Sequence, residues 1–117
     1  MSGLFSRVFG TKSAGLNWLD IAEVKSRLDD VLLVDVRQPE EYHAPPGHLP
    51  GAINVPLADV SARADEIASS GKSVVLVCKT DRRSARAAEV LLAAGLRDVA
   101  VLRGGTDGWH AEGLELE

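Results

Sequence analysis

Cysteine and long apolar runs are scarce in this chain, and each shortage excludes a class of protein. The 117 residues include one cysteine, Cys78, so no disulfide can form within the chain and no cysteine-rich zinc site can be built. That usage suits a reducing compartment, and we expect a cytoplasmic location. The longest aliphatic runs, residues 31–34 and 74–77, are far too short to cross a bilayer, so no membrane span is expected.

Charge is moderate and only slightly biased toward acid. The formal net charge is −4, and 45% hydrophobic with 26% charged residues is ordinary for one globular domain with a real core. The acidic balance, with no basic stripe outside one short segment, argues against nucleic acid as a partner. No ligand cluster with metal spacing is visible in the sequence, so neither a metal nor another cofactor is expected.

Residues 1–15 are expected to lie outside the domain, which we place at residues 16–117. The segment contains Arg7 and Lys12 but no acid, and it lacks the apolar centre of a secretory signal. Four apolar residues would line one side of a short helix: Leu4, Phe5, Val8 and Phe9. A poorly ordered tail, a strap packed on the domain and a segment that docks on a surface or membrane all remain open.

Cys78 stands where an apolar run ends and a basic one begins. Residues 74–77 are aliphatic and residues 85–94 have helical composition, so the thiol is expected on a strand-to-helix turn. Main-chain N–H groups at a helix N-terminus lack intrahelical partners and favour an anion nearby. Between residues 78 and 86, four cations oppose one acid: Lys79, Arg82, Arg83 and Arg86 against Asp81. These features favour a reactive thiolate over an inert buried cysteine, which is the commoner role of a lone cysteine.

Helices and strands are predicted to alternate along the chain. Asp20 and Glu23 form a capping-box pattern that opens a helix to about residue 28. Strands are expected at residues 31–36, 52–55, 74–77 and 99–102, and further helices at residues 39–42, 57–69, 85–94 and 106–111. Aliphatic strands separated by helices indicate a parallel sheet covered on both faces. The functional site should then lie at the carboxyl ends of the strands, in residues 35–38, 78–84 and 103–105.

Four ordered motifs stand near these strand ends. The first is Asp35-Val36-Arg37 followed by Pro39-Glu40-Glu41-Tyr42, and the second is Gly47-His48-Leu49-Pro50-Gly51-Ala52-Ile53-Asn54-Val55-Pro56. The third is Cys78 with Arg83-Ser84 five and six residues later, and the fourth is Leu102-Arg103-Gly104-Gly105 with Gly108-Trp109. With these motifs in this order over about residues 16–116, the chain resembles the rhodanese (sulfurtransferase) family.

The resemblance implies an α/β fold, a rhodanese-like three-layer sandwich with a central parallel sheet of about five strands and helices on both faces. It also implies a transferase of the thiosulfate sulfurtransferase type. Cys78 would take a sulfane sulfur from thiosulfate or a persulfide donor, become a persulfide, and pass the sulfur to cyanide, a thiol or a partner protein. The chain has no second cysteine to resolve that persulfide, so the acceptor must come from outside.

The same resemblance assigns the loop after Cys78 to substrate binding. Its members are Lys79, Thr80, Asp81, Arg82, Arg83 and Ser84. The main-chain N–H groups of residues 79–83 would cradle the persulfide, while the side chains of Lys79, Arg82 and Arg83 would attract the anionic donor.

Two departures from the family pattern affect this expectation. Many members have glycine at the position of Asp81, where flexibility or a positive φ is convenient. An aspartate there would add negative charge near the donor, which weakens the preference for thiosulfate but not persulfide formation. The segment His43-Ala44-Pro45-Pro46 is longer than in compact relatives and would reshape the rim of the pocket.

Five other motif residues are expected to support the site rather than react. Asp35 and Arg37 are predicted to form a buried network that ties loops together. His48 is expected to fix a loop by a hydrogen bond, and Gly104 and Gly105 to permit a close turn beneath the cysteine loop.

Two alternatives remain. Cysteine-dependent phosphatases and arsenate reductases place five residues between cysteine and arginine, whereas the corresponding position here is Ser84. The other alternative is a non-catalytic rhodanese-like module that binds a partner, although such domains usually lose the cysteine or the loop cations.

Overall fold

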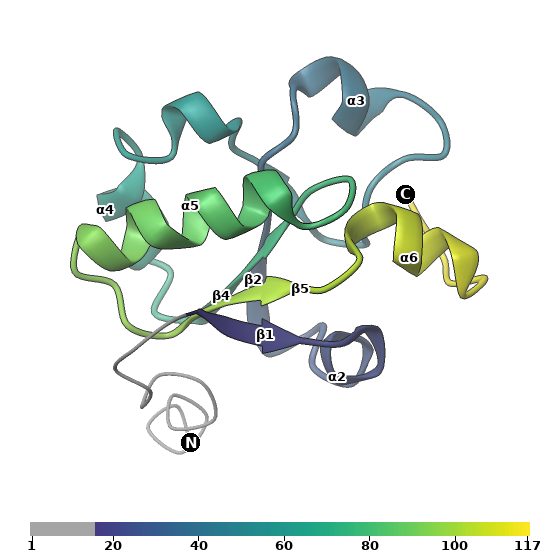
Figure 1. The fold of residues 1–117 in the computed structure, drawn as a ribbon, viewed down its shortest axis with the longest axis horizontal. Helices are drawn as coiled ribbons and strands as arrows, with labels where there is room; N and C mark the ends of the chain where they lie inside the picture. Colours follow the sequence, from purple (N-terminus) through teal and green to yellow (C-terminus); the bar gives the residue numbers. More distant parts are fainter. Residues whose placement is uncertain (1–15) are drawn as a thin grey trace.

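The computed structural model describes residues 16–117 (Figure 1). Its strands are β1 (Asn17–Leu19), β2 (Val31–Asp35), β3 (Ile53–Asn54), β4 (Ser73–Val77) and β5 (Val99–Leu102). Its helices are α2 (Ile21–Lys25), α3 (Pro39–His43), the 3-10 turn η1 (Leu57–Asp59), α4 (Ala64–Ala68), α5 (Arg82–Ala93) and α6 (Gly105–Ala111). The three interpretations of residues 1–15 lie outside the described residues. No helix in the described part is both long and apolar enough to span a membrane.

The five strands form one parallel sheet in the order β1-β5-β4-β2-β3. This confirms the expected sheet of about five strands. Because all strands run the same way, the carboxyl ends of β2, β4 and β5 meet at one edge. Two main-chain hydrogen bonds join them there: the Val36 N–H donates to the carbonyl of Val77 at 2.9 Å, and the Thr106 N–H donates to that of Cys78 at 2.9 Å.

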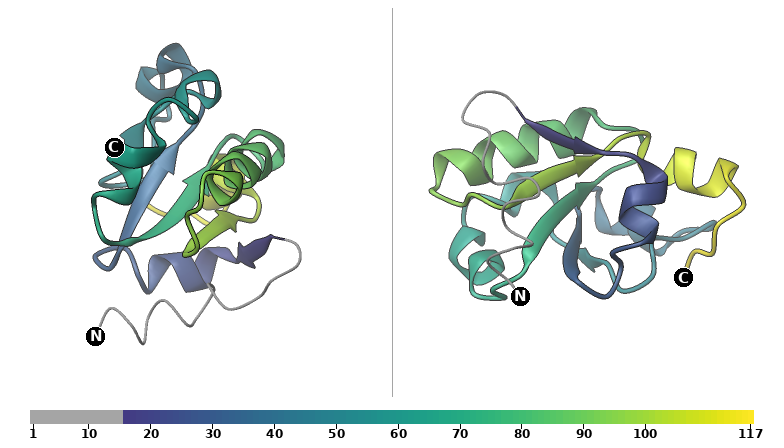
Figure 2. Two further views of the ribbon diagram at one scale, coloured as in Figure 1. Left: turned by 90° about the vertical axis from the view of Figure 1, so that its left-hand side faces the viewer. Right: turned by 90° about the horizontal axis from the view of Figure 1, so that it is seen from below.

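Helices cover both faces of the sheet, which confirms the three-layer α/β fold (Figures 1 and 2). On one face, α4 and α5 bury Ile67 and Leu91 against apolar side chains of β2, β4 and β5. On the other, α2 and α6 bury Val24 and Trp109. The central strands β2, β4 and β5 therefore lie between two apolar layers, which explains why their sequences are runs of aliphatic residues rather than alternating patterns.

Several element boundaries differ from those predicted. β1 was missed because it has three residues and lies at a sheet edge, where Trp18 remains 36% exposed. The Asp20–Glu23 capping box is confirmed by two hydrogen bonds of 2.8 and 2.9 Å, but α2 ends at Lys25 and is followed by turns.

The single helix predicted for residues 57–69 is wrong. That segment forms η1 and α4, separated by a turn. The buried residues Val60, Ala64 and Ile67 have helical spacing, which produced the prediction. Apolar spacing reports which side chains are buried but does not require the backbone between them to be continuous helix.

Candidate active site

Cys78 follows β4 directly and is buried, with 1% of its surface exposed. Helix α5 begins at Arg82, three residues before the predicted start, because the Ala85 N–H closes a first turn onto the Asp81 carbonyl at 3.1 Å. Ser84 therefore lies in the first turn of the helix. Its N–H donates to the Cys78 Sγ at 3.4 Å, and its Oγ lies 3.3 Å from the same sulfur.

The main-chain N–H groups of residues 79–83 have no hydrogen-bond acceptor among residues 16–117. The loop thus offers a series of unpaired donors between the sulfur and the first turn of a 12-residue helix. Such donors, together with the helix dipole, stabilise negative charge close to the loop. Chemically, the arrangement can hold a thiolate or a persulfide anion and meet the charge of a departing oxyanion.

Asp81 does not adopt the backbone conformation that the glycine of other family members suggested. Its φ is −155°, outside the left-handed region, so the backbone at this position does not need the conformational freedom of glycine. Its Oδ2 accepts a hydrogen bond from the Gly104 N–H at 3.4 Å. The carboxylate therefore ties the cysteine loop to the loop after β5.

Gly104 and Gly105 lie directly against the cysteine loop. Their φ values are +89° and +59°. A Cβ atom added to Gly105 would overlap the carbonyl oxygens of Cys78, Lys79 and Thr80. The N–H groups of the next two residues donate to the same loop, Thr106 to the Cys78 carbonyl at 2.9 Å and Asp107 to the Lys79 carbonyl at 3.0 Å. The start of α6 is thus a main-chain support for the loop.

Two of the three cations expected to attract a donor are already paired. The Lys79 Nζ lies 2.8 and 3.0 Å from the carboxylate oxygens of Asp107. The Arg83 guanidinium donates to both carboxylate oxygens of Glu41, also at 2.8 and 3.0 Å. Arg82 is exposed and has no ion-pair partner within residues 16–117. Arg82 is therefore the loop cation whose charge remains uncompensated by a neighbouring carboxylate.

Glu41→Gln is expected to lower the free energy of unfolding at neutral pH by less than about 1 kcal/mol, because both partners of the Glu41–Arg83 pair are 35% exposed. The hydrogen bond from Arg83 lowers the pKa of Glu41 from 4.5 to about 2. A carboxyl group whose pKa is lower in the folded protein stabilises the fold at any pH above its pKa in the unfolded chain. This contribution should therefore be lost as the pH falls from about 4.5 to about 2.

Urea denaturation over that pH range measures the effect. Glu40→Gln is the matched control, since Glu40 is the exposed neighbour and its side chain has no partner in the described part of the chain. A difference between wild type and Glu41→Gln that persisted undiminished below pH 2 would contradict the assignment.

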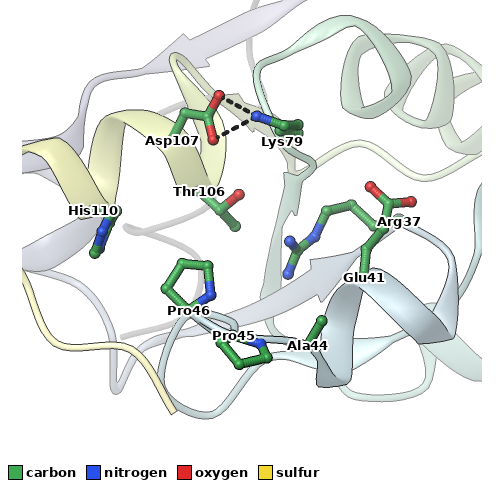
Figure 3. Close-up of a pocket in the computed structure, with 9 residues that line it drawn as sticks. All are labelled: Arg37, Glu41, Ala44, Pro45, Pro46, Lys79, Thr106, Asp107 and His110. Carbon is green, nitrogen blue, oxygen red and sulfur yellow. Dashed lines mark hydrogen bonds and ion pairs between the residues drawn. The ribbon is translucent and has the colours of Figure 1, made fainter.

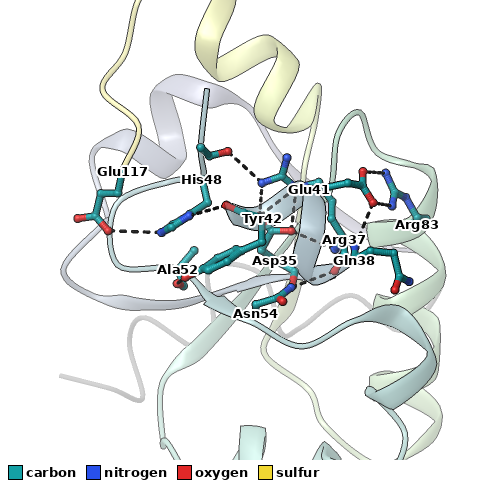
Figure 4. A network of polar contacts seen from close by, with 11 residues as sticks. Asp35, Arg37, Gln38, Glu41, Tyr42, His48, Ala52, Asn54, Arg83 and Glu117 are labelled. Carbon is teal, nitrogen blue, oxygen red and sulfur yellow. Dashed lines mark hydrogen bonds and ion pairs between the residues drawn. The ribbon is translucent and has the colours of Figure 1, made fainter. Parts of the chain in front are cut away.

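A buried polar network stands beside the loop, on the β2 side (Figure 4). The Arg37 Nε donates to the Asp35 carboxylate at 3.0 and 3.1 Å, and its Nη2 donates to the same carboxylate at 2.8 Å. Nη2 also donates to the Gly47 carbonyl at 3.0 Å. The Asn54 amide donates to the carbonyls of both charged residues, at 3.0 and 2.9 Å. The network thus joins the end of β2 to the loop before β3.

His48 belongs to the same region but not to the sulfur site. Its ring stacks on Tyr42 with centroids 3.7 Å apart, and its Nδ1–H donates to the Tyr42 carbonyl at 3.0 Å. The Tyr42 hydroxyl donates in turn to the Ala52 carbonyl. Within residues 16–117 no group of three or more histidine, cysteine or carboxylate side chains is arranged to hold a metal ion.

A pocket of about 250 Å³ opens beside the cysteine loop (Figure 3). Its walls come from Arg37, from residues 44–46 after α3, from Lys79, and from α6. Cys78 itself is not part of the wall. The pocket is therefore a space next to the sulfur cradle rather than the cradle itself.

The sequence did not predict three of the contact partners in this region, which are Glu41, Tyr42 and Asp107. Glu41 lies 42 positions from Arg83, and Asp107 lies 28 positions from Lys79. Glu41 and Tyr42 stand in the first motif, and Asp107 sits within the fourth motif next to Gly108, but nothing in one sequence says which cation each carboxylate meets. The structure also places Asp35 and Arg37 next to the pocket, Gly104 and Gly105 under the loop, and His48 apart from both.

The sheet order, the three loops at one edge and the buried cysteine on a strand-to-helix turn define an α/β protein with a main-chain cradle around a thiol. The family model described as Rhodanese-like domain matches residues 20–112. The chain therefore belongs to the rhodanese-like family, and the resemblance drawn from the four motifs is confirmed.

Similar proteins agree with this membership. The chain is 35% identical over 104 residues to a sulfurtransferase of Allochromatium vinosum, a match that covers 86% of this chain and 94% of that protein. It is 40% identical over 77 residues to the uncharacterized protein YqhL of Bacillus subtilis, covering 66% of this chain and 59% of the relative's length. A solved structure from Rhodopseudomonas palustris, described as a protein of unknown function and possible tyrosine phosphatase, is similar with a TM-score of 0.80 and 29% identity, covering 87% of this chain and 85% of that one.

Proposed function

We propose that this chain transfers sulfane sulfur through a persulfide on Cys78. The observation that carries the proposal is the set of unpaired N–H groups at residues 79–83, next to a cysteine whose sulfur already accepts the Ser84 N–H. We assign these donors to the negative charge that develops during sulfur transfer, where they would stabilise the transition state. The sulfurtransferase name of the Allochromatium relative supports the same chemistry.

In the first step, the Cys78 thiolate attacks the outer sulfur of an anionic donor such as thiosulfate. A new S–S bond forms, the donor's S–S bond breaks, and sulfite leaves with the electron pair. In the second step, cyanide, a thiol or a partner protein attacks the outer sulfur of the persulfide and releases the thiolate. The two steps predict ping-pong kinetics, with parallel double-reciprocal plots.

Arg82 is the side chain that we assign to attracting the donor. It is exposed, it begins α5, and no carboxylate among residues 16–117 pairs with it. Lys79 and Arg83 would contribute less than expected from the sequence, because each is held by a carboxylate at 2.8 Å. The support residues Asp35, Arg37, Gly104 and Gly105 would hold the loop in place without touching the reacting sulfur.

Phosphate ester hydrolysis fits this loop poorly. Position 84, where the phosphatase pattern requires arginine, holds a buried serine packed against the thiol. A tetrahedral phosphate needs a wider cradle than one sulfur atom, with an arginine fork at its end. We therefore propose that a phosphatase assay with an aryl phosphate will show no turnover dependent on Cys78.

The decisive experiment is the intact mass of the purified protein before and after thiosulfate, followed by cyanide. The expected result is a gain of one sulfur atom that cyanide removes, because cyanide attacks the outer sulfur of a persulfide. Cys78→Ser should show no gain. A gain of equal size in the variant would place the sulfur elsewhere, and no gain in the wild type with any sulfane donor would overturn the proposal.

A further inference from the structure

The first turns of α5 carry exposed positive charge that the sulfur chemistry described above uses only in part. Arg82 is the first residue of the helix and Arg86 stands one turn later, and both are exposed. Residues four apart lie on the same side of a helix, so the two side chains share one face, which we call the arginine face. Figure 1 shows that α5 follows the loop from β4 directly, so this face begins beside the cysteine loop.

Neither arginine of this face is neutralised within the described part of the chain. The side chains that form ion pairs with carboxylates among residues 16–117 are Arg37, His48, Arg63, Lys79 and Arg83. Arg82 and Arg86 have no such partner there, and no side-chain hydrogen bond joins either of them to another of these residues. Glu89 follows Arg86 by three residues on α5 but does not pair with it. Two positive charges therefore remain open to a partner.

The energetics of the helix itself do not favour these charges. The helix dipole places partial positive charge at the N-terminus, and two cations four residues apart repel each other. The other four α-helices among residues 16–117 each have an acid in the first turn, namely Glu23 in α2, Glu40 and Glu41 in α3, Asp65 and Glu66 in α4, and Asp107 in α6. The first turn of α5 has none. A helix that departs from a local rule which its neighbours obey is typical of a functional surface.

The length of the arginine face indicates the size of its partner. Four residues of α-helix extend about 6 Å along the axis, so Arg86 lies that much further from the cysteine loop than Arg82 does. A small anion at the loop meets the charge of Arg82, as in the sulfur uptake described above. A partner that meets both charges must extend along the helix. Arginine is enriched in interfaces between proteins, so a protein surface suits this face.

The pattern of charge favours a protein over a nucleic acid. The positive stretch ends at Glu89, which is exposed, and the whole chain has a formal net charge of −4. A nucleic acid carries closely spaced phosphates, which bind to extended rows of cations and are repelled by a chain of negative net charge. A small acidic patch on a protein meets the two arginines without placing further negative charge against Glu89.

We propose that the arginine face of α5 docks an acidic patch of a partner protein that carries the sulfur-accepting thiol. The inference rests on the proposed function, which supplies the persulfide on Cys78. The thiolate of the docked partner attacks the outer sulfur of that persulfide, and the Cys78 sulfur leaves as a thiolate with the electron pair. The partner keeps the transferred sulfur as a persulfide of its own, and no oxidant or reductant is needed.

The test compares two peptides as acceptors for the preloaded persulfide: one has a cysteine followed by a run of glutamates, and the other has glutamines in their place. Loss of sulfur from the protein is followed by intact mass, and rates are expressed per thiolate because the two thiols ionise to different extents. The glutamate peptide is expected to react about tenfold faster at low ionic strength. Added salt should remove most of that difference, since exposed charges are screened. Equal rates at low ionic strength would overturn the inference.

Arg86→Gln removes one charge of the face and keeps a residue that favours helix. The preference for the glutamate peptide should fall to about threefold, while sulfur uptake from thiosulfate stays at the wild-type rate. Arg97→Gln is the matched control, since Arg97 is exposed beyond the other end of α5 and has no ion-pair partner within residues 16–117. This control should keep the full preference. An equal fall in both variants would show that only net charge matters, and it would overturn the inference.

Binding to the protein without a persulfide separates this inference from the proposed function. Here both peptides have serine in place of cysteine, and the main-chain amide shifts of Arg86 and Glu89 report binding. Stronger binding of the glutamate peptide, weakened in Arg86→Gln, supports the arginine face even if sulfur uptake fails. Equal binding of the two peptides overturns the inference even if sulfur uptake succeeds. An oligothymidylate that bound this face more tightly than the glutamate peptide would assign the face to nucleic acid and would also overturn the inference.

Discussion

Asp35→Ala is expected to lower the free energy of unfolding by about 3–5 kcal/mol. The carboxylate of Asp35 is fully buried and accepts from the Nε, the Nη2 and the main-chain N–H of Arg37. Removing it leaves a buried guanidinium that retains only the Gly47 carbonyl as acceptor. Since most of the loss comes from that stranded charge, urea denaturation should show a large fall in the midpoint with little change in slope.

A matched pair on the surface provides the control. Arg63 also donates from its Nε and Nη2 to the Glu66 carboxylate, at 3.0 and 2.8 Å, but these side chains are 37% and 62% exposed. Glu66→Ala should leave the denaturation midpoint almost unchanged, because water replaces the lost carboxylate.

The double variant Asp35→Ala with Arg37→Met should recover much of the stability lost in Asp35→Ala, because no charge is left buried. If Asp35→Ala lowered the free energy of unfolding as little as Glu66→Ala, the Asp35–Arg37 network would not be a buried support of the fold.

The parts of the fold that one sequence predicts are those with a local signal. β2, β4 and β5 are aliphatic runs, and the Asp20–Glu23 pattern is a capping box, so each could be placed from its own residues. β1 has no such signal, because it pairs with residues 100–102 of β5, far along the chain. Its existence depends on a sheet edge that only the folded molecule provides.

The same distinction holds for the candidate site. Cys78 and the cations of its loop stand next to one another in sequence, and the strand-to-helix turn follows from composition. The carboxylates that pair with Lys79 and Arg83 come from other elements, so the charge of the loop was overestimated. The role of Asp81 was also missed, because its partner is the Gly104 N–H on a different strand end. Adding up the charges of neighbouring residues in the sequence cannot include carboxylates that the fold brings from other helices and strands.

Gly105→Ala is expected to destabilise the fold by more than about 3 kcal/mol and to abolish most sulfur uptake. Position 105 has a φ of +59°, which alone costs a residue with a Cβ about 1–2 kcal/mol. In addition, the methyl group would overlap three carbonyl oxygens of the cysteine loop. Because carbonyls and N–H groups of one loop move together, relieving that overlap also displaces the unpaired N–H donors of the cysteine loop.

Gly113→Ala separates the two contributions to this effect. Gly113 has a similar φ of +77°, but no atom lies within 4 Å of the position its Cβ would take. This variant should lose only the conformational part, about 1–2 kcal/mol, and should take up sulfur from thiosulfate at the wild-type rate. The comparison uses urea denaturation for stability and intact mass over time for persulfide formation. Equal losses in the two variants would show that close packing under the loop is not what Gly105 provides. Selective loss of sulfur uptake in Gly105→Ala would show that sulfur uptake depends on the contact between the cysteine loop and the start of α6.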